Sequence, residues 1–163
     1  MYYELTDRFE VKTNLAETWR FFSTAENLPL ITPPWLRFTV ATPSPITIGQ
    51  DTILDYVVRP IGFPMKWKTR IIDWSPPRQF IDLQIKGPYT LWHHQHRFGE
   101  SAGGTLCEDR VTYRLPMSPL GRLFHPVTVR RQLLEIFRFR RKVMAEKLGW
   151  LRAVQEDVRI VTL

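Results

Sequence analysis

The run of strand-like segments in the middle of the chain is the feature that most restricts its fold. Six segments with apolar side chains at alternate positions follow one another, at residues 36–41, 52–59, 65–74, 80–85, 89–98 and 105–115. Pro, Gly and Ser residues in the short connections predict turns. Because short connections join antiparallel neighbours, the segments predict an antiparallel meander.

Helical patterns stand on both sides of this meander. Residues 3–11 alternate as a first strand, and Asn14 with Glu17 three residues later predicts a capped helix start. A second short helix is expected over residues 25–31, before Pro33-Pro34. The last large element is a helix over 120–148, with Pro126 either in its first turn or at a kink, and Gly149 as its end.

Segregated helices around a strand-rich centre predict the α+β class. We expect a curved antiparallel sheet of about seven strands wrapped around the long C-terminal helix, with two short helices after the first strand. No repeat or low-complexity linker divides the chain, so residues 1–149 are interpreted as one domain and 150–163 as a tail. Within the tail, residues 158–163 are either a strand or a frayed end.

The positive charge is concentrated in one element. The 163 residues carry 23 Lys+Arg against 16 Asp+Glu, a net charge of +7. Residues 118–149 hold eight basic and two acidic side chains, which accounts for +6 of it. Such a helix leaves an anionic membrane surface open as a peripheral partner. Its arginines surround the helix without forming one stripe, and no helix-turn-helix or RNP signature is present, so nucleic acid is not favoured.

Composition also excludes several classes of protein. The only cysteine, Cys107, rules out an intramolecular disulfide framework and zinc modules built on two or more cysteines. No apolar run approaches the roughly 18 residues of a membrane span. The first residues do not have the pattern of a signal peptide, so a cytoplasmic protein is expected. Gly-rich phosphate loops and the Gly-x-Ser-x-Gly nucleophile elbow are missing, and no cofactor is predicted.

Several motifs resemble one family. They include the runs Trp74–Phe80, Gly87–Tyr89, Trp92–His96, Gly103–Thr105, Asp109–Val111, Tyr113–Pro116 and Pro119–Leu123, the last followed by Val129-Arg130-Arg131. In these runs and in its order of elements, the chain resembles the helix-grip, Bet v 1-like fold of the START/polyketide-cyclase (SRPBCC) superfamily, and within it a bacterial ligand-binding subgroup. The resemblance extends to about Gly149.

The resemblance implies a cavity between the sheet and the C-terminal helix. Members of the superfamily mostly bind hydrophobic molecules there, so the first hypothesis is binding of a lipid, quinone or polyketide-like ligand. Some members are aromatases, cyclases or dehydratases, which makes a cofactor-free cyclase or dehydratase the alternative. A third hypothesis is a protein that contacts a membrane or an acidic partner through its basic helix.

Two histidines on one strand are the most informative candidates. Trp92, His94, His96 and Phe98 share a face of the strand 89–98, and the aromatic neighbours suggest the inner face. The histidines are then hydrogen-bonded core residues, or a polar grip on a ligand oxygen. A third interpretation is a zinc site in which the two histidines are ligands. Zinc needs a third protein ligand, and Cys107, Asp109 or His125 would have to supply it. No spacing marks a third ligand, so no metal is predicted.

Asp109 is the third candidate, on the next strand. It shares a face with Val111 and Tyr113, which places it in or near the cavity. A buried carboxylate needs a partner, and His94, His96 or a helix arginine would supply it. The pair is either a fixed ion pair or, in an enzyme, a general base in which Asp109 orients a histidine. His94, His96 and Asp109 are therefore catalytic candidates only if the protein is an enzyme.

The long helix has an apolar stripe that includes arginines. At about 100° per residue, Leu134 and Phe137 fall on this stripe, and Arg130 and Arg141 fall within it. These arginines either bind an acidic ligand group or Asp109, or extend to solvent past packed stems. Ile136, Phe139 and Val143 lie on the opposite side, where a homodimer contact or the tail would cover them. The complete set of predicted ligand-binding residues is Trp35, Phe38, Tyr56, Trp67, Thr69, Trp92, His94, His96, Asp109, Tyr113, Arg130, Leu134, Phe137 and Arg141.

Overall fold

A computed structural model describes residues 1–60, 62–116, 128–152 and 157–163. In chain order, the elements are β1 (Tyr3–Val11), α1 (Leu15–Phe22), the 3-10 helices η1 (Ala25–Asn27) and η2 (Pro34–Leu36), β2 (Thr39–Val40), β3 (Ile53–Val58), β4 (Met65–Ser75), β5 (Gln79–Lys86), β6 (Leu91–Ser101), β7 (Gly104–Arg114), α3 (Arg130–Leu148), β8 (Trp150–Arg152) and β9 (Arg159–Thr162). All strands belong to one nine-stranded sheet.

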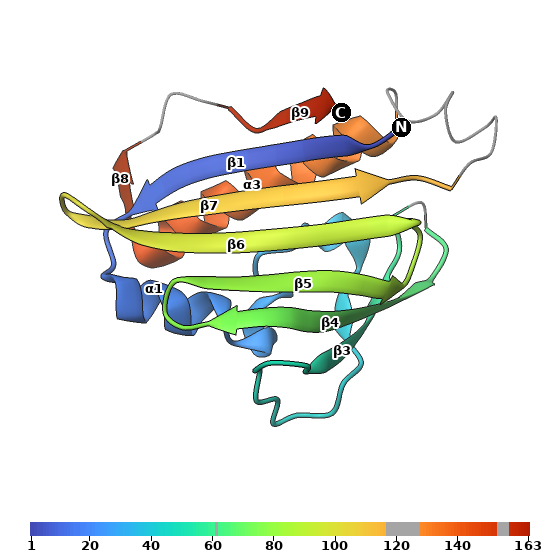
Figure 1. Ribbon diagram of the computed structural model, residues 1–163, viewed down its shortest axis with the longest axis horizontal. Coiled ribbons are helices and arrows are strands. Elements are labelled where there is room, and N and C mark those ends of the chain that lie inside the picture. The colour runs from blue at the N-terminus through green and yellow to red at the C-terminus, as the bar shows by residue number, and fades with distance from the viewer. Residues whose placement is uncertain (61, 117–127, 153–156) are drawn as a thin grey trace.

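The sheet is an antiparallel meander from β2 to β7, and the first strand, β1, pairs with β7. Its order is β2-β3-β4-β5-β6-β7-β1-β8, and β9 also pairs with β1. Figure 1 shows α3 lying behind β1 and β7 and running along them, with α1 on the same side of the sheet. This is the α+β helix-grip arrangement that the sequence predicts. None of the helices in the described ranges is long and apolar enough to cross a membrane.

The first helix begins where the capping pattern predicts. The Asn14 side chain accepts a hydrogen bond from the backbone N–H of Glu17 at 2.9 Å, which satisfies one of the free donors at the start of α1. Leu15, Thr18 and Phe22 form its buried side. The cap therefore fixes the position from which Phe22 reaches the space between sheet and helices.

Two of the predicted elements are shorter than expected. The predicted helix over 25–31 is reduced to the 3-10 helix η1, and the predicted strand over 36–41 to the two residues of β2. In the second case, Pro34 starts a 3-10 helix and Arg37 adopts a left-handed conformation with φ of 44°. This conformation turns the chain away from the extended path of a strand. The apolar residues of the segment 36–41 therefore lie mostly in a loop and not in a strand.

The C-terminal part contains more strands than expected. Two segments of the predicted tail, β8 and β9, pair with β1 and raise the number of strands above the seven expected. The described helix α3 begins at Arg130, and the predicted start over 120–127, with Pro126, lies outside the described residues. Gly149 ends the helix as predicted, with φ of 72°.

Two buried clusters seat the long helix against the sheet. One cluster includes Phe9 of β1 and Met144 of α3, both with no exposed surface. The other includes Leu5 of β1 and Phe137 of α3. Because both clusters combine β1 with α3, the helix is held at two places along its length.

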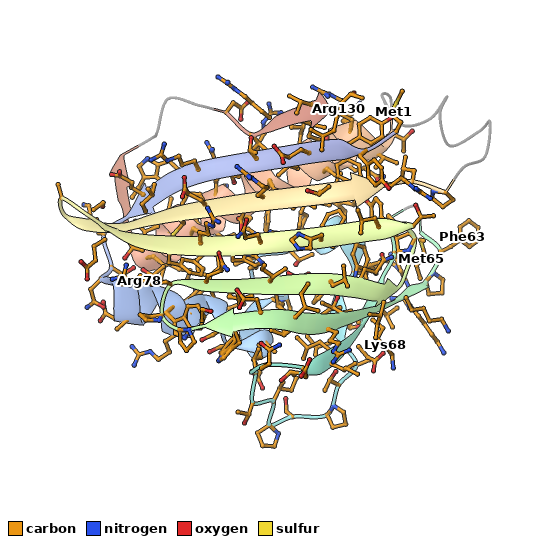
Figure 2. The ribbon with its side chains drawn as sticks, in the orientation of Figure 1. Met1, Phe63, Met65, Lys68, Arg78 and Arg130 are labelled. Atoms are coloured by element: carbon orange, nitrogen blue, oxygen red, sulfur yellow. The ribbon has the colours of Figure 1, made fainter. Side chains whose placement is uncertain are left out.

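The opposite faces of the strands carry polar side chains. In β4, Trp67 and Thr69 point inward, and the neighbouring Lys68 pairs with Asp55 at 3.3 Å on the outer side. Figure 2 shows Lys68 directed away from the body of the molecule, and Phe63, 73 % exposed, in the loop before β4. This alternation assigns Trp67, Thr69 and Ile71 to the inner space, up to the shift in register between Ile71 and Asp73.

Candidate functional site

Three neighbouring strands bring four ionisable side chains together on the inner face of the sheet. The antiparallel register places Asp82 of β5 opposite His94 of β6, and Asp109 of β7 opposite His96 of β6. Both histidines and Asp109 are at most 5 % exposed, which confirms the inward direction that the alternation predicts. The predicted pairing of Asp109 with the histidines is also confirmed.

The four side chains form a closed ring of contacts. His94 Nε2 lies 3.2 Å from Asp109 Oδ1, and its Nδ1 lies 3.5 Å from Asp82 Oδ2. His96 Nδ1 lies 2.6 Å from Asp109 Oδ1, and its Nε2 lies 3.2 Å from Asp82 Oδ2. The centroids of the two imidazole rings are 3.8 Å apart. Each carboxylate therefore bridges the two rings, and each ring lies between the two carboxylates.

The electrostatics of this ring keep the carboxylates charged. Burial alone would raise the pKa of Asp109, but the histidines His96 and His94 outweigh it and hold that pKa well below its usual value. The pKa of Asp82 is lowered in the same way, against its burial, by the nearby histidines. Both side chains are thus expected as carboxylates at neutral pH.

The two histidines are shifted in opposite directions. Burial, followed by the charge of His96, lowers the pKa of His94. Burial would also lower the pKa of His96, but Asp109 and Asp82 outweigh it and raise that pKa. Of the two rings, His96 is the one that holds a proton more readily.

Arg140 of α3 lies at the edge of this ring of contacts. Its Nη1 is 3.6 Å from Asp109 Oδ2, and its guanidinium lies 5.1 Å from the centroid of the Phe137 ring. The side chain is only 12 % exposed. Its Nε and Nη1 atoms, and Asp109 Oδ2, are buried without a hydrogen-bond partner among the described residues. Arg140 therefore still has donors to offer to a guest molecule or to water.

A cavity of about 650 Å³ opens beside this cluster. Side chains of β3, β4, β5 and β6 form one wall, and Leu133, Ile136 and Phe137 of α3 form part of the other. Apart from Asp82, His94, His96 and Arg140, the lining is dominated by apolar and aromatic groups. The cavity thus combines a broad apolar surface with one charged region.

Aromatic rings close one part of the cavity wall. The centroids of Trp67 and Trp92 are 5.3 Å apart with nearly perpendicular rings, and Tyr89 lies within 5.5 Å of both. Phe38 and Tyr56 form a second ring pair at 5.1 Å. Edge-to-face and tilted contacts of this kind fix the rings in place. They give the wall a rigid surface against which a flat apolar molecule could pack.

The structure brings together eight of the predicted ligand-binding residues around this cavity: Phe38, Tyr56, Trp67, Thr69, Trp92, His94, His96 and Phe137. Asp109 lies directly behind the histidines, and Leu134 is half-buried against the second core cluster. Trp35 is 43 % exposed in the 3-10 helix η2 and is not part of the lining. Tyr113 has no exposed surface and stacks on Tyr3 at 5.3 Å, so it belongs to the core.

The two arginines predicted to face the cavity have other contacts. Arg141 donates to the Asp7 carboxylate of β1, which is fully buried, and to the carbonyl of Arg8 at 3.0 Å. Arg130 donates to the carbonyl of Ile160 in β9 at 2.8 Å. Neither lines the cavity. These side chains connect the helix to the first and last strands, and Arg140 takes the position at the cavity.

The apolar residues assigned to the far side of the helix are also covered within the chain. Val143 is 9 % exposed in the first core cluster, and Phe139 packs against that cluster. Ile136 lines the cavity. The buried positions of the helix are Leu133, Phe137, Val143, Met144 and Leu148, so Phe137 of the predicted stripe is confirmed and Leu133 takes the place of the half-buried Leu134.

Sequence reasoning missed Asp82 and Arg140. Asp82 shares a face of β5 with the buried Phe80, but Ile81, Leu83 and Ile85 alternate on the other face, so the signal for an inward Asp82 was weak. Arg140 follows Phe137 by three positions and precedes Met144 by four, which is the spacing of the buried face. Each of these signals concerns a single element. That Asp82 and Arg140 line the same cavity depends on how the strands and the helix are arranged.

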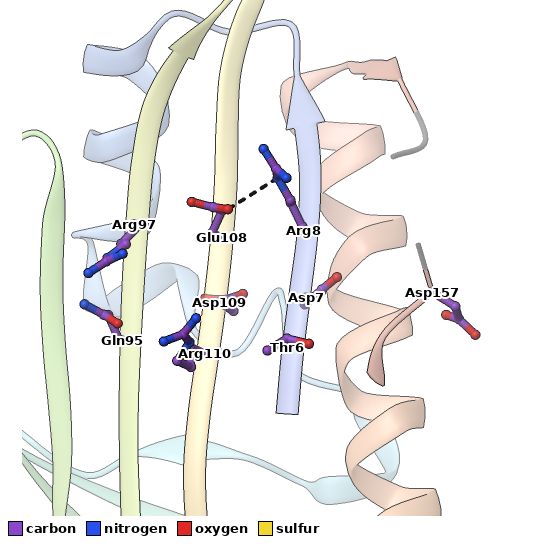
Figure 3. A pocket seen from close by; sticks show the side chains of 9 residues that line it. All are labelled: Thr6, Asp7, Arg8, Gln95, Arg97, Glu108, Asp109, Arg110 and Asp157. Atoms are coloured by element: carbon purple, nitrogen blue, oxygen red, sulfur yellow. Dashed lines mark ion pairs between the residues drawn. The ribbon is translucent and has the colours of Figure 1, made fainter. Parts of the chain in front are cut away.

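A second, smaller hollow of about 150 Å³ lies on the outer side of β6, β7 and β1. Figure 3 shows Arg8 extending from β1 toward Glu108 of β7, with their ion pair at 3.3 Å, and Asp7 directed toward α3. Gln95, Arg97 and Arg110 complete the polar outer surface. Its charged groups are partly paired with one another, and its small size makes it a weaker candidate than the apolar cavity.

Comparison with known proteins agrees with this fold. Solved structures that are similar include the protein Ms6760 from Mycobacterium smegmatis, with a TM-score of 0.68, 16 % identity, and coverage of 92 % of this chain and 93 % of that one. A START superfamily protein from the same organism has a TM-score of 0.67, 13 % identity, and coverage of 90 % and 97 %. The di-domain ARO/CYC StfQ from the steffimycin biosynthetic pathway has a TM-score of 0.64, 15 % identity, and coverage of 90 % of this chain and 53 % of that one.

The sequence comparisons give a match to one family model but to no curated protein. No curated protein matches the chain significantly. The model of the family described as "Polyketide cyclase / dehydrase and lipid transport" matches residues 11–138, from the end of β1 into α3. That match spans β2 to β7 and includes Asp82, His94, His96 and Asp109, and it covers most of the chain, so the chain belongs to the polyketide cyclase/dehydrase and lipid transport family.

Proposed function

We propose that the protein binds an apolar, ring-containing small molecule in the cavity between the sheet and α3. The observation that supports this most is the cavity itself, about 650 Å³ with a mainly apolar and aromatic lining. Pockets for small molecules typically have about 300–1,000 Å³ and a few polar groups that orient the ligand. The family, which includes lipid carriers and cyclases, is consistent with such a guest.

The charged region at one side of the cavity sets the expected orientation of the guest. Arg140 has buried donors without a hydrogen-bond partner in the described part of the chain, and His94 and His96 line the same region. A ligand oxygen placed there would satisfy these donors, while the rest of the molecule packs against Trp67 and Trp92. The expected class is therefore an aromatic or polycyclic molecule with a carbonyl, hydroxyl or carboxylate at one end.

Catalysis by the histidines is the second candidate function, and the geometry supports it less. Both rings line the cavity, as a general acid or base must. However, both nitrogens of His94 and of His96 already lie within 3.5 Å of a carboxylate oxygen. A ring would have to give up one of these contacts before it could exchange a proton with a guest, so binding is the better-supported function.

The test reduces the free volume of the cavity by replacing one side chain of its wall with a larger one. Thr69 is 2 % exposed and lines the cavity from β4, so Thr69→Phe adds a ring to the inner space. Lys68→Phe is the matched control, because it adds the same ring to the same strand on the outer side. Binding of 1-aminoanthracene, a neutral fluorescent aromatic probe, is measured by fluorescence titration, and folding by circular dichroism.

We expect Thr69→Phe to weaken binding of the probe at least about tenfold, the equivalent of about 1.4 kcal/mol, and Lys68→Phe to leave it unchanged. Native mass spectrometry of the freshly purified wild-type protein would then search for a bound molecule. The proposal is wrong if a folded Thr69→Phe protein binds the probe as tightly as the wild type, or if the wild type does not bind it.

A further inference from the structure

Two histidines and one carboxylate converge on a single point beside the cavity. One ligand atom from each of Asp82, His94 and His96 lies within 4.8 Å of the other two. Asp82 Oδ2 is 3.5 Å from His94 Nδ1 and 3.2 Å from His96 Nε2. These three groups come from adjacent strands, which are rigid elements that hold side chains accurately.

The separations match those of ligands around a small tetrahedral ion. Zinc binds imidazole nitrogen and carboxylate oxygen at about 2.0–2.2 Å, so two ligands of a tetrahedral site lie roughly 3.3–3.5 Å apart. The two distances from Asp82 Oδ2 fall at or next to this range. The two nitrogens lie within 4.8 Å of each other, so rotation of the imidazole rings toward a shared ion would complete the site.

Asp109 occupies the position of an outer carboxylate. It contacts the nitrogens that point away from Asp82, at 3.2 Å for His94 Nε2 and 2.6 Å for His96 Nδ1. Histidines that bind metals regularly donate their second N–H to a carboxylate, which fixes the ring and the tautomer. Here a single carboxylate could orient both rings at once.

Hydrogen-bonding capacity gives an independent reason for an ion at this place. A neutral imidazole has one N–H donor and one lone pair. When His94 donates its Nε2–H to Asp109, its Nδ1 lone pair faces Asp82 Oδ2 at 3.5 Å, and that oxygen has no proton to give. His96 is hydrogen-bonded to Asp82 through Nε2, and its Nδ1 has no hydrogen-bond partner in the described part of the chain. A cation there would convert the unfavourable contact of His94 Nδ1 with Asp82 into two metal bonds, and it would replace the proton between His96 Nε2 and Asp82.

We propose that Asp82, His94 and His96 form a binding site for one divalent first-row transition-metal ion, with Asp109 as the carboxylate that orients both histidines. Two nitrogens and one oxygen suit Zn²⁺ and Fe²⁺ among the metals of proteins. All three ligands line the cavity, so the remaining coordination position faces the space for a guest. A water molecule or a guest oxygen would occupy it.

The charges nearby are compatible with such an ion. Asp82 and Asp109 contribute two negative charges, and Arg140 one positive charge 3.6 Å from Asp109 Oδ2. Adding a divalent cation leaves a net charge of +1 in the cluster. This charge favours an anionic oxygen at the open position. The inference does not depend on the proposed apolar guest, because the metal can be measured alone.

The experiment uses untagged protein that has been stripped with a chelator and then loaded with Zn²⁺ or Co²⁺ alone. Zinc binding is measured by calorimetry, and cobalt binding by the visible absorption of the bound ion, which reports its coordination geometry. The variants are Asp82→Asn, His96→Gln and Asp109→Asn. His93→Gln is the matched control, since His93 lies on β6 directly before His94 and does not line the cavity.

We expect one ion per chain in the wild type and in His93→Gln, and binding weakened by more than about 100-fold in Asp82→Asn and His96→Gln. Asp109→Asn should lose about 10- to 100-fold, the usual effect of removing a supporting carboxylate. Circular dichroism separates loss of the ion from loss of the fold, and the cobalt spectrum of the wild type needs no substitution. The proposal fails if the wild type binds neither ion, or if folded Asp82→Asn and His96→Gln bind as well as His93→Gln.

Discussion

The ion pair between Arg141 and Asp7 is the contact whose removal should be most informative about stability. Arg141 of α3 donates to the carboxylate of Asp7, whose side chain has no exposed surface. Burial raises the pKa of Asp7 to about 6, although Arg141 acts in the opposite direction. Replacing Arg141 by Met keeps the apolar stem and removes the charge, which leaves the carboxylate buried without this partner.

The size of the effect depends on pH in a defined direction. In the wild type, the pKa of Asp7 is about 6 in the folded state against 3.8 in the unfolded state. Protonated Asp7 therefore stabilises the fold below about pH 4, and this contribution is lost as the pH rises through 6. The shift of roughly two units corresponds to about 3 kcal/mol. Without Arg141, the pKa of Asp7 in the folded state rises further, so the free energy of unfolding continues to fall at higher pH.

We expect Arg141→Met to lower the free energy of unfolding by about 3–5 kcal/mol at pH 8, the usual cost of breaking a buried ion pair. At pH 5, where Asp7 is largely protonated in both proteins, the expected loss is only about 1–2 kcal/mol. Urea unfolding followed by tryptophan fluorescence measures both values. The double variant Asp7→Asn/Arg141→Met should recover part of the loss at pH 8.

Arg138→Met is the matched control, one helical turn earlier. Arg138 pairs with Asp157 at the surface, with side chains 53 % and 59 % exposed. Such an exposed pair contributes at most about 1 kcal/mol, and little of that changes between pH 5 and pH 8. Equal losses for Arg141→Met at the two pH values, or a loss no larger than that of Arg138→Met at pH 8, would refute the reasoning.

Two further predictions concern the core and the first helix, and the same urea unfolding measures both. Phe9→Ala should cost about 3–5 kcal/mol, because the Phe9 ring is fully buried and stacks near Trp150; a loss below 1 kcal/mol would show that the cluster repacks. Asn14→Ala should cost about 1 kcal/mol, because the backbone N–H of Glu17 loses its acceptor; a cost as large as that of Phe9→Ala would contradict a purely capping role.

Periodicity was sufficient to predict the long strands and their faces. The alternation in β6 and β7 placed His94, His96 and Asp109 inside, because a period of two leaves only two possible faces and the aromatic neighbours choose between them. The need of a buried carboxylate for a partner predicted His94, His96 or a helix arginine beside Asp109, and the structure has partners of both kinds. Where the chain contains prolines, as before β2, the pattern of apolar residues was a poor guide, since a loop can also bury them.

The charged cluster needed information that periodicity does not contain. Asp82 reaches His94 only because the register of β5 against β6 places them opposite each other. On the helix, the position of Phe137 was predicted correctly, but the apolar stripe was too broad to decide which of the neighbouring arginines reaches the cavity. This uncertainty was enough to put Arg141 at the cavity in the prediction, where the structure has Arg140.

The position of the first strand has a consequence for the order in which the protein folds. β1 pairs with β7 over its whole length, with Tyr3 opposite Tyr113 and Val11 opposite Thr105. The hairpins from β3 to β7 can form between near neighbours, but β1 must wait until a segment about a hundred residues later is available. Such distant pairing slows folding, to milliseconds or seconds in proteins of this type. During synthesis, the apolar side of β1 stays without its β7 partner until β7 has left the ribosome, and an unpaired apolar strand of this kind is prone to aggregation.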